Sequence, residues 1–235
     1  DITTAGLKSV AIRMPRHELA LRLIELSKLP LAAPSANKSG RPSPTSAGHV
    51  FEDMKDDIPY IIDGGSADFG LESTVLSLVS DRPTIFRPGA VSREEIAGLI
   101  GDCVLADSLM RKLKEGESAP SPGMKHRHYA PRASLTLVKG KNTQEYIKNA
   151  YDGAGNACIL CFESNIQGYG DRKCYSLGEN ARTAARLLFE LVRRADDEGI
   201  DCLFSETLEE TGLGLAVMNR MLRASSFTLI DSDNL

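Results

Sequence analysis

A segment rich in proline and glycine, residues 108–133, constrains the fold of this chain more than any other feature. It contains S-A-P-S-P-G and then M-K-H-R-H-Y-A-P, and such a density of proline and glycine interrupts regular secondary structure. The segment carries six basic and two acidic side chains, whereas residues 1–107 and residues 134–235 each carry 11 basic and 15 acidic ones. We therefore expect a basic linker at 108–133 between two acidic domains, 1–107 and 134–235.

Both expected domains alternate strand-like and helix-like apolar patterns, which is typical of α/β folds. Before the linker, this periodicity predicts strands over 8–14, 31–33, 60–62, 73–79 and 84–87, a helix over 17–28 and a helix start at Ser92. After it, the predicted strands are 135–138, 157–162 and 202–204, with a long helix around 184–191 and a closing helix over 215–224. The second half thus resembles a small doubly wound, Rossmann-like α/β domain.

Composition excludes several classes of protein. Hydrophobic residues make up 42% of the chain and charged residues 26%, as in ordinary globular proteins, and the net charge of −4 argues against a general nucleic-acid coat. No apolar stretch approaches the roughly 20 residues needed to span a bilayer, so we expect no membrane partner. Five cysteines without a regular framework favour reduced thiols and a cytoplasmic setting. Cys158 and Cys161 form a C-x-x-C that reads as a buried strand rather than a zinc or redox site.

The segment P-S-A-N-K-S-G-R-P-S-P-T, residues 34–45, is the most informative for chemistry. It concentrates hydroxyls, an amide, two cations and three prolines, and the prolines fix the backbone φ angle. Hydroxyls and backbone N–H groups at such a turn can cradle phosphate oxygens, although a serine- and proline-rich surface loop has the same composition. Thr45 is predicted to cap the helix that follows.

Six segments, whose order along the chain also agrees, resemble those of one family, the threonylcarbamoyl-AMP synthases. S-A-N-K-S-G-R-P-S-P-T is similar to the signature of their YrdC-like catalytic domain, and the linker is similar to that of the longer members. The other matching segments are V-A-I-R-M-P at 10–15, D-G-G to G-L-E-S-T-V at 63–75, I-F-R-P-G at 85–89, and E-T-G-L-G-L-A-V-M-N-R-M-L-R-A at 210–224. The resemblance implies a partial YrdC-like α/β domain with a twisted mixed sheet, then a small Rossmann-like domain.

The resemblance implies an enzyme, a nucleotidyltransferase that condenses L-threonine, bicarbonate and ATP into threonylcarbamoyl-AMP and releases pyrophosphate. The product serves to modify the tRNA adenosine next to the anticodon, so the tRNA threonylcarbamoyl-transfer machinery is the expected downstream partner, and a contact with tRNA fits the same reading. Mg²⁺ would be held mostly by ATP phosphates and water.

Matching the family's motifs residue by residue assigns a substrate site. Arg13 is expected on the threonine carboxylate, because a guanidinium can make two parallel hydrogen bonds to it, although an arginine at a strand end is commonly a surface residue. Ser9 stands where the family usually has threonine. Tyr129 of the linker is expected to close over the nucleotide as a lid. The expected ATP-binding residues are Ser9, Ser35, Asn37, Ser43, Arg87 and Tyr129, and the expected threonine-binding residues are Arg13, Ala33 and Ser73.

No nucleophile, general base or metal ligand is assigned. The proposed chemistry needs no protein nucleophile, and His126 and His128 have no evident third partner for a metal. Ser39 is expected to shape the nucleotide loop. The family's catalytic domain begins well before the segment that matches Asp1, so we expect a fragment with impaired activity on its own.

Two alternatives are retained. A carbamoyltransferase of the hydrogenase-maturation type also contains a YrdC-like domain, but it would add zinc-finger and acylphosphatase modules. A non-catalytic RNA-binding or regulatory module would need a broad basic face or exposed aromatic side chains, and aromatic residues are only 6% of the chain.

Overall fold

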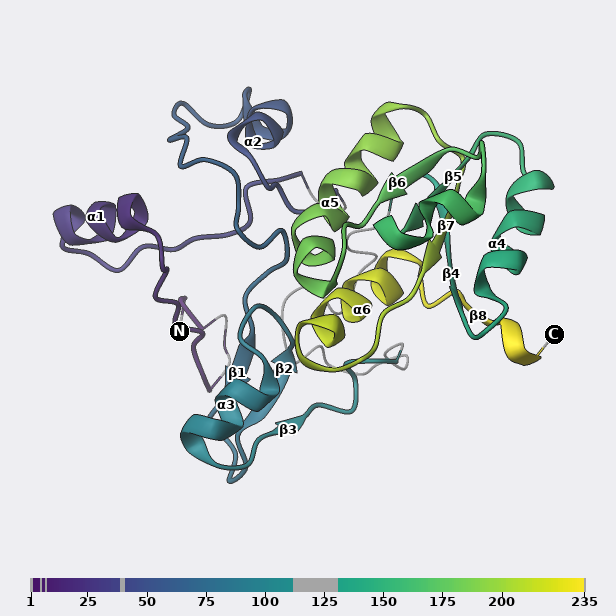
Figure 1. The fold of residues 1–235 in the computed structure, drawn as a ribbon. Coiled ribbons are helices and arrows are strands. Elements are labelled where there is room, and N and C mark those ends of the chain that lie inside the picture. The colour runs from purple at the N-terminus through teal and green to yellow at the C-terminus, as the bar shows by residue number, and fades with distance from the viewer. Residues whose placement is uncertain (1, 5, 7, 39–40, 112–130, 235) are drawn as a thin grey trace.

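A computed structural model of the chain describes residues 2–4, 6, 8–38, 41–111 and 131–234 (Figure 1). The first part of the chain contains α1 (Glu18–Ser27), α2 (Ala47–Met54), β1 (Val75–Ser77), β2 (Thr84–Arg87), α3 (Arg93–Ile100) and β3 (Val104–Leu105). The second part contains β4 (Ser134–Lys139), α4 (Thr143–Asp152), β5 (Ala157–Cys161), η1 (Glu163–Tyr169), β6 (Cys174–Ser176), α5 (Ala181–Asp197), β7 (Cys202–Glu206), α6 (Gly212–Ala224), β8 (Leu229–Asp231) and η2 (Ser232–Asn234).

The second part is a parallel sheet in the order β6-β5-β7-β4-β8. Helices α5 and α6 cover the face that is turned toward the first part, and α4 lies on the opposite face (Figure 1). Every residue of β5 is buried, which is expected of a central parallel strand with helices on both faces. These features confirm the predicted small Rossmann-like domain.

The first part contains a small mixed sheet in the order β1-β2-β3, with β1 antiparallel and β3 parallel to β2. Its core is formed by Ile85, Ile96 and Cys103. Ser92 begins α3 as predicted, because its Oγ accepts from Glu95 N at 3.2 Å while Glu95 Oε2 accepts from Ser92 N at 2.7 Å. The mixed sheet confirms the α/β fold class predicted for this part.

Several predicted local features are wrong. Residues 8–14, 31–33 and 60–62 form no strand, because no described residue pairs with their backbone, and Ile12 is 89% exposed. A strand needs a hydrogen-bonding neighbour, which alternation alone does not supply. The N-cap of α2 is Ser46, whose Oγ accepts from His49 N, while the predicted cap Thr45 instead lies with its hydroxyl 3.2 Å from His49 Nδ1.

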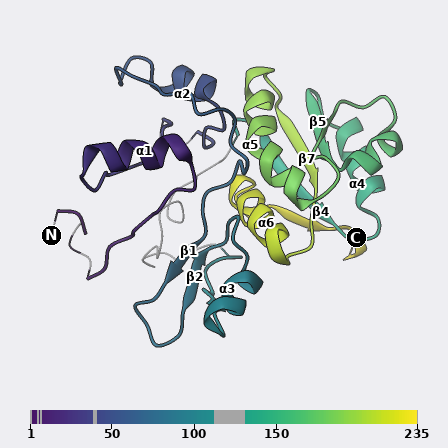
Figure 2. The ribbon, with the colours of Figure 1, turned by 60° about the vertical axis from the view of Figure 1, so that its left-hand side comes forward.

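Helix α1 stands apart from the rest of the molecule, and Figures 1 and 2 agree on this. It contains no buried residue, and its leucines Leu19, Leu23 and Leu26 are all exposed. Most helical stability in proteins comes from packing of an apolar face rather than from propensity. Helix α1 therefore receives little stabilisation from the described part of this chain.

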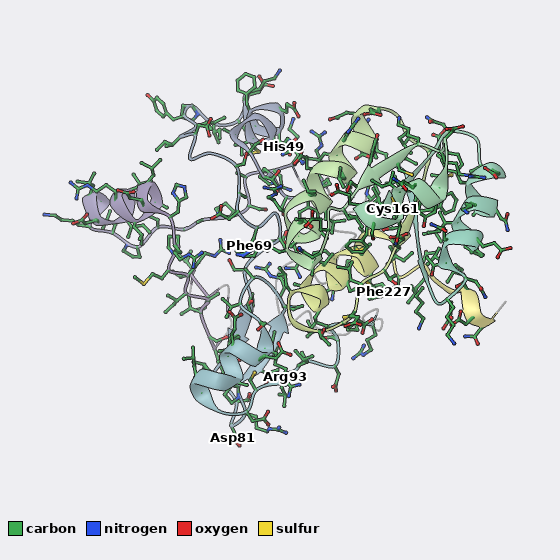
Figure 3. The ribbon with its side chains drawn as sticks, in the orientation of Figure 1. His49, Phe69, Asp81, Arg93, Cys161 and Phe227 are labelled. Atoms are coloured by element: carbon green, nitrogen blue, oxygen red, sulfur yellow. The ribbon has the colours of Figure 1, made fainter. Side chains whose placement is uncertain are left out.

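Residues 69–72 join the two parts. Leu71 belongs to the same buried cluster as Leu188 and Met221 of the second part, and Gly70 N donates to Ala185 O at 3.0 Å. A Cβ on Gly70 would lie 2.5 Å from Arg186 O, so only glycine permits this approach to α5. Phe69 lies beside α5 with the guanidinium of Arg182 over its ring at 5.2 Å (Figure 3).

The predicted linker lies mostly outside the described residues, and the predicted domain boundaries stay predictions. Within the described ranges, every helix is too short or too polar to cross a membrane.

Candidate functional site

Three predicted site residues, Ser43, Ser73 and Arg87, converge although they are far apart in sequence. Ser43 Oγ donates to Glu72 Oε1 at 2.5 Å, and Glu72 immediately precedes Ser73. Arg87 Nε donates to Ser73 O at 3.1 Å, and the Arg87 side chain is buried. The structure thus brings together the hydroxyl-rich loop (residues 34–45), the segment before β1 and the end of β2.

The close approach of two backbones explains the sequence R-P-G after β2. A Cβ on Gly89 would lie 2.3 Å from Thr74 N and 2.5 Å from Glu72 O, distances that no side chain tolerates. Glycine is therefore required at this position for the end of β2 to pack on residues 72–74. This packing brings Arg87 against Ser73.

Glu72 connects these elements and was not among the predicted site residues. Besides Ser43, its carboxylate accepts from Arg220 Nε of α6 at 2.8 Å. Burial acts to raise the pKa of Glu72, but the positive charge of Arg220 and the hydrogen bonds from Ser43 and Arg220 outweigh burial and hold the pKa below its ordinary value. Glu72 is therefore a carboxylate at neutral pH and an acceptor only.

A second ion-pair cluster fixes the hydroxyl-rich loop just before Ser43. Arg193 of α5 binds Asp53 Oδ2 at 2.9 Å and also donates to Pro42 O, while Arg41 binds Asp53 Oδ1. The Asp53 side chain is fully buried. Desolvation acts to raise the pKa of Asp53, but the hydrogen bonds and charges of Arg193 and Arg41 lower it overall. Both helices that face the first part thus contact the predicted nucleotide loop or its partner Glu72.

Asn37 lies within the same loop and closes it. Its Nδ2 donates to Lys38 O at 3.0 Å and to Arg41 O at 3.1 Å. Its buried Oδ1 has no hydrogen-bond partner among the described residues. An unpartnered amide oxygen can accept a hydrogen bond from a ligand. Ser35, two residues earlier, is exposed.

The other predicted site residues are not brought into this cluster. Ser9, Arg13 and Ala33 are exposed, and Arg13 makes no hydrogen bond or ion pair with the described residues. Tyr129 and Ser39 lie outside the described residues, as do His126 and His128. The lid therefore stays a prediction.

A cavity of about 600 Å³ opens beside the loop, but Ser43, Ser73 and Arg87 do not line it. It is lined by loop residues Ala36 and Pro44, by Ser46 of the α2 cap and by Tyr60 and Gly64. In the described part of the chain, no group of three or more His, Cys, Asp or Glu side chains could hold a metal ion.

The C-x-x-C pair takes no part in this site. Cys158 and Cys161 are free and buried in β5, within the sheet of the second part (Figure 3). Burial raises the pKa of the Cys158 thiol to about 12. Such a thiol is protonated at neutral pH and is a poor nucleophile or metal ligand, in agreement with the buried strand predicted there.

Two family models match the chain. Residues 91–226 match a family described as threonylcarbamoyl-AMP synthase, C-terminal domain, and residues 1–89 match a family described as telomere recombination. Their division falls near residue 90, earlier than the boundary predicted from linker composition.

Curated relatives carry the same name. The chain is 43% identical to a threonylcarbamoyl-AMP synthase of Pyrococcus abyssi over 97% of its own length and 67% of that protein. It is 42% identical to one of Bacillus subtilis, over 97% of this chain and 66% of that one. For Schizosaccharomyces pombe the identity is 36%, over 96% and 59%. The chain thus spans about two thirds or less of the length of these relatives.

A solved structure has the same fold. The P. abyssi protein Sua5 complexed with L-threonine superposes with a TM-score of 0.85 at 42% identity, over 97% of this chain and 67% of that chain. The agreement extends over both parts of the molecule and supports their relative placement.

Proposed function

Because this chain belongs to the threonylcarbamoyl-AMP synthase family, we propose that it serves as an L-threonylcarbamoyladenylate synthase. The reaction condenses L-threonine, bicarbonate and ATP, with release of pyrophosphate. The observation that carries the proposal is that Ser43 contacts the Glu72 carboxylate while Arg87 contacts the adjacent Ser73 backbone oxygen, which brings Ser43, Ser73 and Arg87 together. A structural relative that is 42% identical over 97% of the chain was solved with L-threonine, which supports a threonine site here.

The proposed site divides between two substrates. Arg87 is proposed to bind ATP phosphate, because a buried guanidinium neutralises charge as pyrophosphate leaves. Asn37 Oδ1 and Ser43 supply polar contacts to the nucleotide from the loop. Ser73 is proposed at threonine. Further proposed residues are Ser9, Ser35 and Tyr129 at ATP, and Arg13 and Ala33 at threonine.

The proposed chemistry relies on positioning. The amine of threonine attacks the carbon of CO₂ with loss of a proton, or the carbon of bicarbonate with loss of water, and gives a carbamate. A carbamate oxygen then attacks the α-phosphorus of ATP, and the bond to pyrophosphate breaks. Holding the reactants in line and stabilising the phosphates supplies most of the acceleration in such a scheme. Mg²⁺ would accompany the phosphates and help neutralise them.

The proposal places the protein in tRNA modification. Its product is a mixed anhydride that must be consumed by the tRNA threonylcarbamoyl-transfer machinery. We propose a cytoplasmic setting, which the five free cysteines support.

Replacement of Arg87 tests the function. The full-length gene product is incubated with ATP, bicarbonate and threonine, and both pyrophosphate and the acyl-adenylate are quantified. Arg87→Gln should lower kcat/KM by about 100-fold or more, which is typical when one charge-stabilising donor is removed. Arg82→Gln is the matched control, because Arg82 is an exposed arginine just before β2 and is paired with Asp102. Pyrophosphate release that does not depend on threonine would contradict the proposal.

The same assay decides the alternatives. A tRNA gel shift without any pyrophosphate release would favour a non-catalytic RNA-binding module. Turnover with carbamoyl phosphate in place of threonine and bicarbonate would favour a carbamoyltransferase. Comparison of residues 1–235 with the full-length protein tests the predicted impairment of this chain alone.

A further inference from the structure

We propose that Arg220 of α6 is a positioning residue for the substrate site and acts through Glu72. The inference rests on the proposed function and adds a role for the second part of the chain, to which no substrate contact has been assigned. Arg220 touches none of the proposed substrate-binding side chains itself. It binds the segments that carry them.

The guanidinium of Arg220 is fully buried and forms hydrogen bonds with two segments of the first part. Its Nε and Nη2 hold the carboxylate and backbone oxygen of Glu72, at 2.8 and 3.1 Å. Its Nη1 donates to Pro88 O at 2.8 Å. Glu72 precedes Ser73, and Pro88 follows Arg87. One side chain of α6 therefore clamps the residues adjacent to both members of the Ser73–Arg87 pair.

Glu72 extends this clamp to the hydroxyl-rich loop. One carboxylate oxygen faces Arg220 and the other accepts from Ser43 Oγ at 2.5 Å. The carboxylate therefore fixes the Ser43 hydroxyl hydrogen and leaves the lone pairs of Oγ facing away from Glu72. If Arg220 is lost, Glu72 keeps a buried charge without its cation and must turn toward water, which releases Ser43 as well.

A lysine cannot replace this arrangement. The planar guanidinium of arginine presents donors in fixed directions, and here those donors reach Glu72, Pro88 and Asn219 together. A lysine ammonium has one position for its charge and cannot reach all three acceptors. Arg220→Lys therefore preserves charge and helix propensity while it removes the geometry.

Arg193 supplies the matched comparison. It is also an arginine of the second part, with a side chain only 4% exposed, and it also crosses to the first part. Its partners are Asp53 and Pro42 O, so it contacts the loop but neither Glu72 nor the Ser73–Arg87 pair. A purely structural role for Arg220 predicts the same behaviour for both arginines.

The test uses Arg220→Lys, Arg193→Lys and wild type in the full-length protein, with KM and kcat measured separately for ATP and threonine. Arg220→Lys should raise KM for both substrates by about tenfold or more, the scale of a lost charged hydrogen bond. Arg193→Lys should raise KM for ATP only. Equal effects of the two substitutions on both substrates would overturn the inference.

Hydrogen exchange of the unliganded proteins tests the geometry without any assay of activity. Arg220→Lys should accelerate exchange at residues 72–74 and 89, whereas Arg193→Lys should accelerate it at residues 41–50. If Arg220→Lys does not fold, Glu72→Gln removes the charge at constant shape and should show the same exchange pattern to a smaller degree. Unchanged exchange at 72–74 in the folded variant refutes the positioning role. An inactive wild type with the expected exchange pattern refutes the proposed function alone.

Discussion

The two parts of the molecule differ in how much buried core they contain and in which of them holds the proposed substrate-binding residues. In the described part of the chain, every exposed large hydrophobic side chain lies between Ile2 and Ile100, whereas residues 134–235 hold nearly all of the buried apolar core. The side chains proposed to touch substrates lie in the first part and, for Tyr129, in the linker, while Arg193 and Arg220 of the second part hold the loop and strand that carry several of them.

The contrast shows that residues of the second part hold segments that carry the proposed site. Within the described residues, the small mixed sheet has three buried core residues. Leu71 and Glu72 connect it to the larger core, because one inserts into the apolar cluster and the other pairs with Arg220. Substitutions in the two parts should therefore differ in size in predictable ways.

The largest difference is expected for apolar truncation. Phe189→Ala in the fully buried core of α5 should lower the free energy of unfolding by about 3–5 kcal/mol. Leu23→Ala in α1, where the side chain is 49% exposed, should change it by less than about 0.5 kcal/mol. Urea unfolding of the 235-residue chain measures both. Similar costs for the two substitutions would remove the contrast.

A smaller effect is expected for the ion pairs that join the parts. Asp53→Ala leaves Arg193 buried without its anion and should cost about 3 kcal/mol. Asp102→Ala removes an exposed partner of Arg82 and should cost less than about 1 kcal/mol. Thermal melting followed by circular dichroism compares them. If the two losses of stability are equal, burial does not determine how much the Asp53 cluster contributes to stability.

Loss of a helix cap should cost the same in both parts of the molecule, because capping is a local effect. Ser92 caps α3 of the first part and Asn180 caps α5 of the second, and in each case the backbone N–H of the cap donates to the side chain of the third helical residue. Replacing either by alanine should cost about 1 kcal/mol, and replacing either by glycine only a few tenths of a kcal/mol. Denaturant midpoints of the four variants check this. A much larger loss at Asn180 would show that the cap depends on its surrounding core.

The smallest effect concerns the decrease in stability at low pH. Hydrogen bonds from Lys173, then from Arg194 and Tyr175, lower the pKa of Glu198 to about 2. Because the folded pKa lies below the ordinary value of 4.5, the stabilisation by Glu198 is complete above that value and is lost as pH falls toward about 2. Carbon-detected NMR titration of the carboxyl group reports the midpoint directly. A midpoint near 4.5 would mean that these exposed bonds do not persist in water.

Much of the fold could be predicted from periodicity. The strand predicted over 84–87 coincides with β2, and the strands and helices predicted after the linker all exist within a few residues. Their apolar runs are buried on a parallel sheet, so local pattern and final environment agree. The strand predicted over 8–14 fails because Val10 and Ile12 alternate correctly but have no neighbouring strand in the described residues.

The candidate site could be predicted only where a motif marks it. Ser43, Ser73 and Arg87 lie in segments with distinctive composition, and the structure places them together. The pairing of Glu72 with Arg220 joins residues 148 positions apart, and no local pattern encodes such a contact. The available signal was a charged residue in a helix whose neighbours Val217 and Met221 are apolar, since a buried arginine demands a partner.

The junction between the two parts, residues 69–72, limits how this molecule can move. A hinge there would have to withdraw Leu71 from the apolar cluster and separate Gly70 from the backbone of α5. Rotation of one part against the other as rigid bodies is therefore confined to small amplitudes. The same junction keeps Glu72 beside Ser43 and Arg220, so the two parts hold the segments of the proposed site as one unit.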